Sequence, residues 1–155
     1  MKIVCAVVAF APVAQADDPA AKSGAVYLAP KDMKWGEAPP VLPKGAKLTV
    51  LHGDPMKAGS FTIRLKASGG YKIPPHFHTQ DEQLTVISGT LVLRMGETMT
   101  DAHKLGAGAY HFLPGKMNHA AEFKGETIVQ IHGEGPFDIQ YLNPADSPTP
   151  KAARK

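Results

Sequence analysis

Apolar and polar positions alternate in short runs along the chain from residue 48 onward. In the segment SFTIRLKA, residues 60–67, apolar side chains occupy every second position. A period of two predicts a strand with one buried and one exposed face. Further short β-rich runs follow, each bounded by Gly, Pro or Asn, at AYHFLP, HAAEF, TIVQIH and FDIQYL. Because no amphipathic helical stretch separates these runs, the pattern predicts an all-β sandwich or barrel.

One longer apolar stretch, LTVISGTLVLRM at residues 84–95, contains two β-rich runs joined at Ser88-Gly89-Thr90. A short glycine-containing break between two such runs is typical of a hairpin turn. The sequence therefore predicts two strands in this stretch.

The chain opens with MKIVCAVVAFAPVAQADD, in which a lysine is followed by an apolar run and then by Ala-Gln-Ala. This pattern predicts a secretory signal peptide at residues 1–16, cleaved after Ala16. The alternative, a buried N-terminal helix, is disfavoured because Pro12 interrupts the run. The run is shorter than the roughly 20 residues that span a bilayer, and no later segment reaches that length. We therefore expect a soluble periplasmic or secreted protein with no membrane attachment after signal removal.

Length and composition predict one domain with two flanking segments. At 155 residues the chain suffices for a single core. Residues 17–47 are rich in Pro, Ala, Gly and Lys without a period, which predicts an extended N-terminal arm anchored by Trp35. The all-β domain is expected at 48–143, and a flexible Pro-rich and basic tail at 144–155.

Charge and cysteine content exclude several functions. The net charge is +3 and the lysines are scattered, so no nucleic-acid partner is expected. The single cysteine, Cys5, lies in the predicted signal peptide. The mature chain would therefore have neither a cysteine nucleophile nor a disulfide.

The segment GGYKIPPHFHTQDEQLTVISGT, residues 69–90, carries the candidate chemistry. His76 and His78 are two residues apart on an extended segment, so their side chains point to the same face. On the next predicted strand, Glu82 shares a face with the apolar positions that follow it. We therefore expect Glu82 to point inward and Asp81 outward.

Burying two imidazoles and a carboxylate together is costly unless a cation binds them. A third nitrogen ligand is expected from His119, which begins another predicted strand after Pro114 and the loop GKMN. These residue types suit one divalent metal ion.

Both motifs of the cupin family can be placed on the chain, which resembles a small exported single-domain cupin. The first motif matches at every spacing with Gly70, His76, His78, Glu82 and Gly89. The second matches at Gly108, Pro114 and His119, with Lys116 and Phe123 standing where the family has glycine and asparagine. The resemblance implies a double-stranded β-helix, or jelly-roll barrel, with an extended N-terminal arm. It also implies that His76, His78, Glu82 and His119 bind one divalent metal inside the barrel.

Three imidazoles and one carboxylate leave one or two positions open on a metal with five or six ligands. Cupins that resemble this chain include dioxygenases, oxalate-degrading enzymes and isomerases. We expect a metal-dependent oxidoreductase, most simply a dioxygenase of a small oxygenated organic compound. The alternative is a cupin that binds or senses a metal or small ligand without turnover.

Several partners follow from the same resemblance and from the predicted export. The family favours Mn or Fe, whereas loading outside the cytoplasm favours Cu or Zn, and Ni also suits such a site. A homodimer is expected because small cupins often dimerise.

His132, beside Gln130 on one side of TIVQIH, is expected to line the cavity as a proton carrier; the alternative is a satisfied histidine at a strand end. The sequence leaves the role of His111 open.

Overall fold

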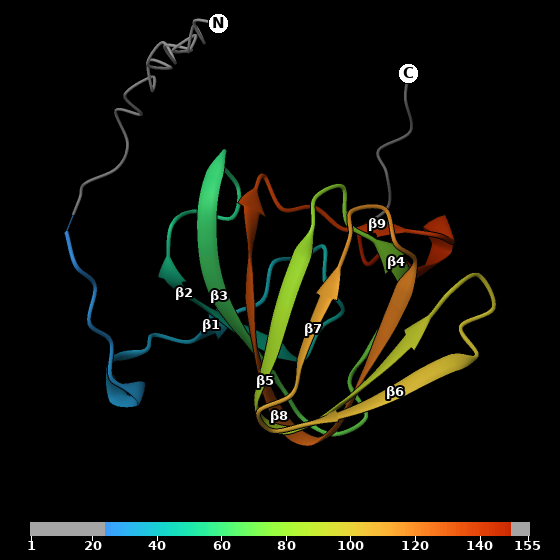
Figure 1. The fold of residues 1–155 in the computed structure, drawn as a ribbon, viewed down its shortest axis with the longest axis horizontal. Coiled ribbons are helices and arrows are strands. Elements are labelled where there is room, and N and C mark those ends of the chain that lie inside the picture. Colours follow the sequence, from blue (N-terminus) through green and yellow to red (C-terminus); the bar gives the residue numbers. More distant parts are fainter. Residues whose placement is uncertain (1–23, 150–155) are drawn as a thin grey trace, which may run out of the picture.

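The computed structural model of the protein describes residues 24–149. The predicted signal peptide, the first residues of the arm and the end of the tail lie outside this range. Within it, the elements in chain order are two 3-10 helices and nine strands: η1 (Pro30–Asp32), β1 (Gly36–Glu37), β2 (Ala46–His52), β3 (Gly59–Ala67), β4 (Lys72–Phe77), β5 (Glu82–Met95), β6 (Asp101–Gly106), β7 (Tyr110–Leu113), β8 (His119–Gly135), β9 (Gln140–Tyr141) and η2 (Pro144–Asp146) (Figure 1).

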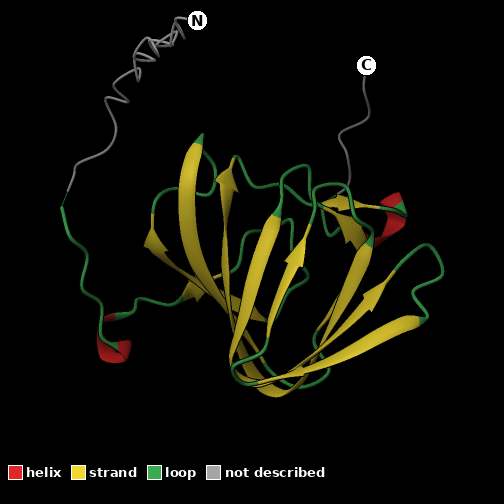
Figure 2. Cartoon of the chain, in the orientation of Figure 1, coloured by secondary structure: helices red, strands yellow, loops and turns green. Residues whose placement is uncertain are grey.

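Two long strands, β5 and β8, each pair with different strands along their two halves. The first half of β5 pairs with β7 and the second half with β6. The first residues of β8 pair with β4 and the last with β3, while β5 runs beside β8 along both halves. All of these pairs are antiparallel. The nine strands therefore form one continuous sheet that bends at β5 and β8 and folds over on itself, which is the predicted jelly-roll barrel (Figure 2).

The expected hairpin at Ser88-Gly89-Thr90 is wrong, because β5 continues through it as one bent strand. Gly89 has a φ of 77°, and a Cβ at this position would lie 2.4 Å from the carbonyl oxygen of Glu126. The register between β5 and β8 shifts here, as expected for bulges. The runs HAAEF and TIVQIH likewise belong to one strand, β8, rather than to two. The glycine-containing breaks in these two stretches therefore mark places where a strand bends at a corner of the barrel, not turns between two strands.

The core lies inside the folded sheet and follows the predicted alternation. On β3 the buried positions are Phe61, Ile63, Leu65 and Ala67, and the residues between them are partly exposed. β5 and β8 supply the facing side chains, among them Val86, Leu91, Phe123 and Val129, each of which is at most 1% exposed. The buried positions of the strands are therefore mostly apolar; the polar exceptions are Thr49, Thr127, three histidines and Glu82.

The N-terminal arm follows one edge of the barrel before β2 begins at Ala46, two residues before the expected domain boundary. β1 pairs with β2, and the ammonium group of Lys66 lies 4.6 Å from the ring centroid of Trp35. The hydroxyl of Tyr71 donates to the carbonyl of Pro43 at 2.9 Å, and that of Tyr141 to the carbonyl of Val41 at 2.8 Å. These contacts hold the end of the arm against the barrel.

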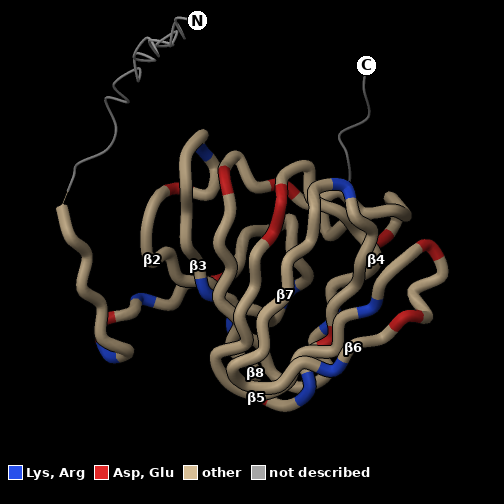
Figure 3. Tube along the Cα trace, in the orientation of Figure 1, with Lys and Arg blue, Asp and Glu red and all other residues tan. Residues whose placement is uncertain are grey.

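Basic and acidic residues both occur on the arm and on the barrel (Figure 3). Among residues 24–149, no helix has the length and apolar character needed to cross a membrane.

Candidate metal centre

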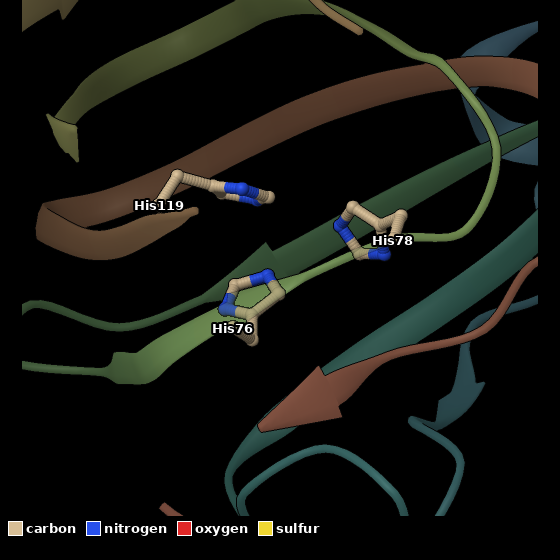
Figure 4. A group of neighbouring side chains, drawn as sticks. All are labelled: His76, His78 and His119. Carbon is tan, nitrogen blue, oxygen red and sulfur yellow. The ribbon is translucent and has the colours of Figure 1, made fainter. Parts of the chain in front are cut away.

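Three histidines, one on β4, one just after it and one on β8, converge inside the barrel (Figure 4). His76 lies on β4 and is the Cα partner of His119, the first residue of β8. His78 follows β4 directly. The three rings lie with centroids 4.1, 5.0 and 5.1 Å apart. One nitrogen from each of these buried side chains lies within 4.8 Å of the others, so the group could hold a metal ion.

Glu82 lies beside this group at the start of β5. Its two carboxylate oxygens lie 3.8 Å from the Nε2 atoms of His78 and His119. Glu82 is 5% exposed, whereas Asp81 is exposed, as the alternation along the strand predicts. Asp81 instead accepts a hydrogen bond from the Gly115 N–H at 2.8 Å, so it fastens the loop before β8.

Each of the three imidazoles is oriented by a backbone carbonyl at its Nδ1 atom. The partner of His76 is Pro74, at 2.7 Å, and that of His119 is Met117, at 3.0 Å. His78 is bonded to the carbonyl of Asp138. Because a carbonyl can only accept, each Nδ1 must carry the proton and each Nε2 keeps a free lone pair. This is the arrangement that fixes histidine as a metal ligand.

The electrostatics of the group also fit a cation. Burial, with smaller contributions from the neighbouring imidazoles, lowers the pKa of His76 to about 2. Burial lowers the pKa of His78 and of His119 as well, and it raises the pKa of Glu82 against the opposing effect of His119. The imidazoles are therefore neutral donors, and an ionised Glu82 lacks a positive partner that a divalent metal would supply.

The group lies in the wall of a cavity of about 500 Å³. The rest of the wall is largely apolar, with side chains such as Ile63, Leu84, Leu93 and Ile131. The end of the arm, residues 39–42, closes part of the cavity. An organic molecule in this space would be surrounded by hydrocarbon and would meet polar atoms at few points.

His132 does not line this cavity, contrary to expectation. It lies on the outward face of β8, because the adjacent Ile131 faces the core. Its Nδ1 is 3.2 Å from the Thr62 hydroxyl, and its Nε2 is 3.0 Å from the Gln130 amide. It borders a separate cleft of about 380 Å³. The apolar neighbours in TIVQIH already indicated this orientation, so His132 is a satisfied outer-face histidine.

His111 does line the cavity. It shares the inner face of β7 with buried Leu113, while Tyr110 and Phe112 are 56% and 48% exposed. The sequence could not assign this face, because both faces of the strand carry large apolar residues.

Comparison with solved structures supports the fold. An acetylacetone dioxygenase from Acinetobacter johnsonii matches with a TM-score of 0.63 at 17% identity, over 86% of this chain and 87% of that one. A polyketide cyclase from Streptomyces resistomycificus matches with a TM-score of 0.63 at 16% identity, over 79% and 88%. An RmlC-like cupin from Shewanella frigidimarina matches with a TM-score of 0.57 at 15% identity, over 70% and 88%. At such identities the likeness shows the fold alone.

The family comparison covers the same part of the molecule. No curated protein matches the chain. The family model described as the ChrR cupin-like domain matches residues 23–138, which include strands β1 to β8 and all four clustered residues. Since this match extends over most of the chain and the barrel has the cupin fold, the protein belongs to the ChrR cupin-like family.

Proposed function

We propose that the protein is a metal-dependent oxidoreductase, dioxygenase-like, acting on a small oxygenated organic compound. The observation that carries this proposal is the arrangement of three buried histidines and Glu82 in the wall of a largely apolar cavity. A closed structural site has no need of a cavity beside it, whereas a substrate site does.

His76, His78 and His119 would hold one divalent metal through their Nε2 atoms, and Glu82 would add a carboxylate oxygen. Such an ion, whether Mn, Fe, Cu, Zn or Ni, supplies Lewis-acid or redox chemistry at the positions that these four ligands leave free. The backbone carbonyls at Nδ1 keep the imidazoles in one orientation. The negative charge of Glu82 strengthens the binding of the cation in a site where water is scarce.

The apolar wall selects the compound. A molecule with a hydrocarbon body and its oxygen atoms at one end would place those oxygens among the histidines and bury the rest. A structural neighbour is an acetylacetone dioxygenase, which makes oxygenation the reaction to test first.

A second candidate function is binding without turnover. Asp138, the other acidic residue in the cavity wall, accepts hydrogen bonds from the Thr79 N–H and hydroxyl at 2.8 and 2.7 Å and from the Gln140 amide at 2.9 Å. These bonds occupy its oxygens, so it is a poor general base. This observation favours a cupin that holds a ligand rather than converts it.

Metal content tests the site itself. Protein purified without chelator and without a histidine tag should hold about one divalent ion per chain by elemental analysis, given a single four-ligand set. The His76→Ala, His78→Ala double variant should lose the ion, and Glu82→Gln should weaken its binding because it removes the charge and keeps the shape. Asp81→Asn is the matched control and should retain the metal. Stoichiometric metal in the double variant, or loss in Asp81→Asn but not in Glu82→Gln, would overturn the assignment.

Oxygen uptake separates the two candidate functions. The metal-loaded protein is mixed with enolic, phenolic and sugar compounds while dissolved O2 is recorded. Uptake that disappears in the double variant supports the oxidoreductase. Binding of a compound without O2 uptake across the panel supports the second candidate.

We also propose that the protein is exported, on the strength of its N-terminal pattern. Protein from the producing cell should then begin at Asp17; N-terminal sequencing that still reads Met1 contradicts export.

A further inference from the structure

One polar side chain of the cavity is not explained by metal binding. Within residues 24–149, the two ring nitrogens of His111 are the only buried side-chain nitrogen or oxygen atoms without a hydrogen-bond partner. The residue lies on β7, opposite Leu84 of β5. Leu84 and Glu82 are both buried and lie on the same face of β5. Its ring is part of the cavity wall.

Such a group is unusual in a folded protein, because buried polar atoms are almost always paired. Burial, with a contribution from His119, lowers the pKa of His111 to about 4, so the ring is neutral near pH 7. A neutral imidazole has one N–H donor and one acceptor nitrogen. No protein group among residues 24–149 pairs with either nitrogen, and a buried polar atom without a partner costs stability.

His111 differs from the other three cavity histidines in how it is held. Each of those rings has its Nδ1 bonded to a backbone carbonyl, whereas no hydrogen bond holds the ring of His111. His111 also stands outside the group whose nitrogens could share one ion. Since rotation of its ring breaks no hydrogen bond, the ring can turn toward a molecule that enters the cavity.

We propose that His111 is a substrate-binding residue that hydrogen-bonds a hydroxyl or carbonyl oxygen of the compound in the cavity. This inference rests on the proposed function and adds to it a second polar contact. The compound then carries its oxygen functions at one end of an apolar body, where an oxygen on or beside the metal also meets the ring of His111. A neutral imidazole can accept a hydrogen bond from a hydroxyl or donate one to a carbonyl. An enol or a phenol offers an oxygen of this kind.

The test compares two histidine-to-leucine variants. His111→Leu removes the unpaired nitrogens and keeps an apolar side chain in the wall. His132→Leu is the matched control, because that histidine borders the separate cleft and its nitrogens are paired. The probe is 4-nitrocatechol, a phenol whose spectrum changes when it chelates a metal, and azide serves as a small anion that occupies the metal without filling the cavity.

His111→Leu should raise the melting temperature of the metal-free protein and weaken 4-nitrocatechol binding by about tenfold, the effect of one hydrogen bond lost to an oxygen left in an apolar site. Azide affinity should stay within about twofold, since azide need not reach the ring. His132→Leu should do the reverse: a lower melting temperature and unchanged affinity for 4-nitrocatechol. His111→Gln, which keeps a donor and an acceptor, should recover part of the lost affinity.

The possible failures are distinct. If wild-type protein takes up metal and binds azide, but His111→Leu binds 4-nitrocatechol as tightly as wild type, the role of His111 is overturned and the proposed function stands. If wild-type protein takes up no metal, the proposed function fails and the role of His111 fails with it. A lower melting temperature or loss of folding in His111→Leu would show that its nitrogens are already satisfied, which also overturns the inference.

Discussion

Lys116 occupies the position where the cupin motif has glycine, and it adopts the backbone conformation that glycine favours. Its φ is 67°, in the left-handed region, and its N–H donates to the carbonyl of His78 at 2.7 Å. The substitution therefore leaves the loop before His119 in place and puts strain into it, since a side chain at positive φ costs about 1–2 kcal/mol.

We expect Lys116→Gly to keep the unfolding free energy within about 1 kcal/mol of wild type, because relief of strain offsets the greater flexibility of the unfolded chain. Lys116→Val should lower it by more than about 1 kcal/mol, since a β-branched residue tolerates this conformation poorly. Denaturant unfolding of both variants measures the difference. Equal stability of the two would show that residue 116 does not hold a positive φ in solution.

At the scale of single residues, the sequence predicts which face of a strand a side chain occupies where the neighbouring residues are clearly apolar or polar. His76 and His78 share a face by their spacing, and Glu82 turns inward because the apolar positions after it do. The orientation of His111 could not be predicted, because its strand has large apolar residues on both faces. His132 was expected in the cavity from its place on one side of TIVQIH with Gln130, but the neighbouring Ile131 faces the core, so His132 points outward.

Gly89 shows how an element depends on contacts distant in the sequence. A hairpin and a bent strand both need glycine here, and only the partner strand distinguishes them. In the barrel, Thr127 approaches Gly89 closely, and its hydroxyl donates to the carbonyl of Thr90 at 3.1 Å. Thr127 lies 37 residues from Thr90 in the sequence, so the residues around Gly89 could not reveal this contact.

Substitution of Gly89 by alanine should therefore be severe. The new Cβ would lie 2.4 Å from the Glu126 carbonyl oxygen and 2.7 Å from the Thr127 Cα atom, so the corner must open. Gly108→Ala is the control, because Gly108 also has a positive φ, 84°, but nothing lies within 4 Å of its Cβ position. We expect Gly108→Ala to cost about 1–2 kcal/mol of unfolding free energy and Gly89→Ala at least about 2 kcal/mol more. Similar losses in the two variants, measured by urea unfolding, would mean that the corner is not closely packed.

The barrel as a whole was predictable because period-two segments recur without helices between them. Its strand count was not predictable, because β5 and β8 bend at glycine-containing breaks and continue as single strands. The arm was recognisable by its composition, but its place over the cavity depends on Tyr71 and Tyr141, whose hydroxyls bond backbone carbonyls that carry no sequence signature.

Burial of the histidine group should make the metal-free protein sensitive to acid. The pKa of His76 falls from its ordinary value of 6.5 to about 2 on folding, so the unfolded chain binds a proton more readily than the folded one. The resulting stability is complete above pH 6.5 and is lost as the pH falls. Between pH 7.5 and 5.5 His76 alone should remove about 1.4 kcal/mol of unfolding free energy.

Urea unfolding of chelator-treated protein at these two pH values measures the loss. His76→Gln should shrink it by about the amount assigned to His76, since glutamine does not titrate. Saturating metal should raise the unfolding free energy at both pH values, because an ion that binds only the folded state stabilises it. A metal-free protein equally stable at both pH values would show that the imidazoles are open to water.

The carbonyls that orient the three imidazoles belong to Pro74, Met117 and Asp138, and every amino acid offers the same carbonyl. Mutations at these three positions can therefore change the side chain without turning the three imidazoles, provided that the backbone keeps its path. The apolar side chains of the cavity wall, such as Ile63, Leu84 and Ile131, take no part in these bonds either. The shape of the cavity could therefore vary among related barrels while the three rings keep one orientation.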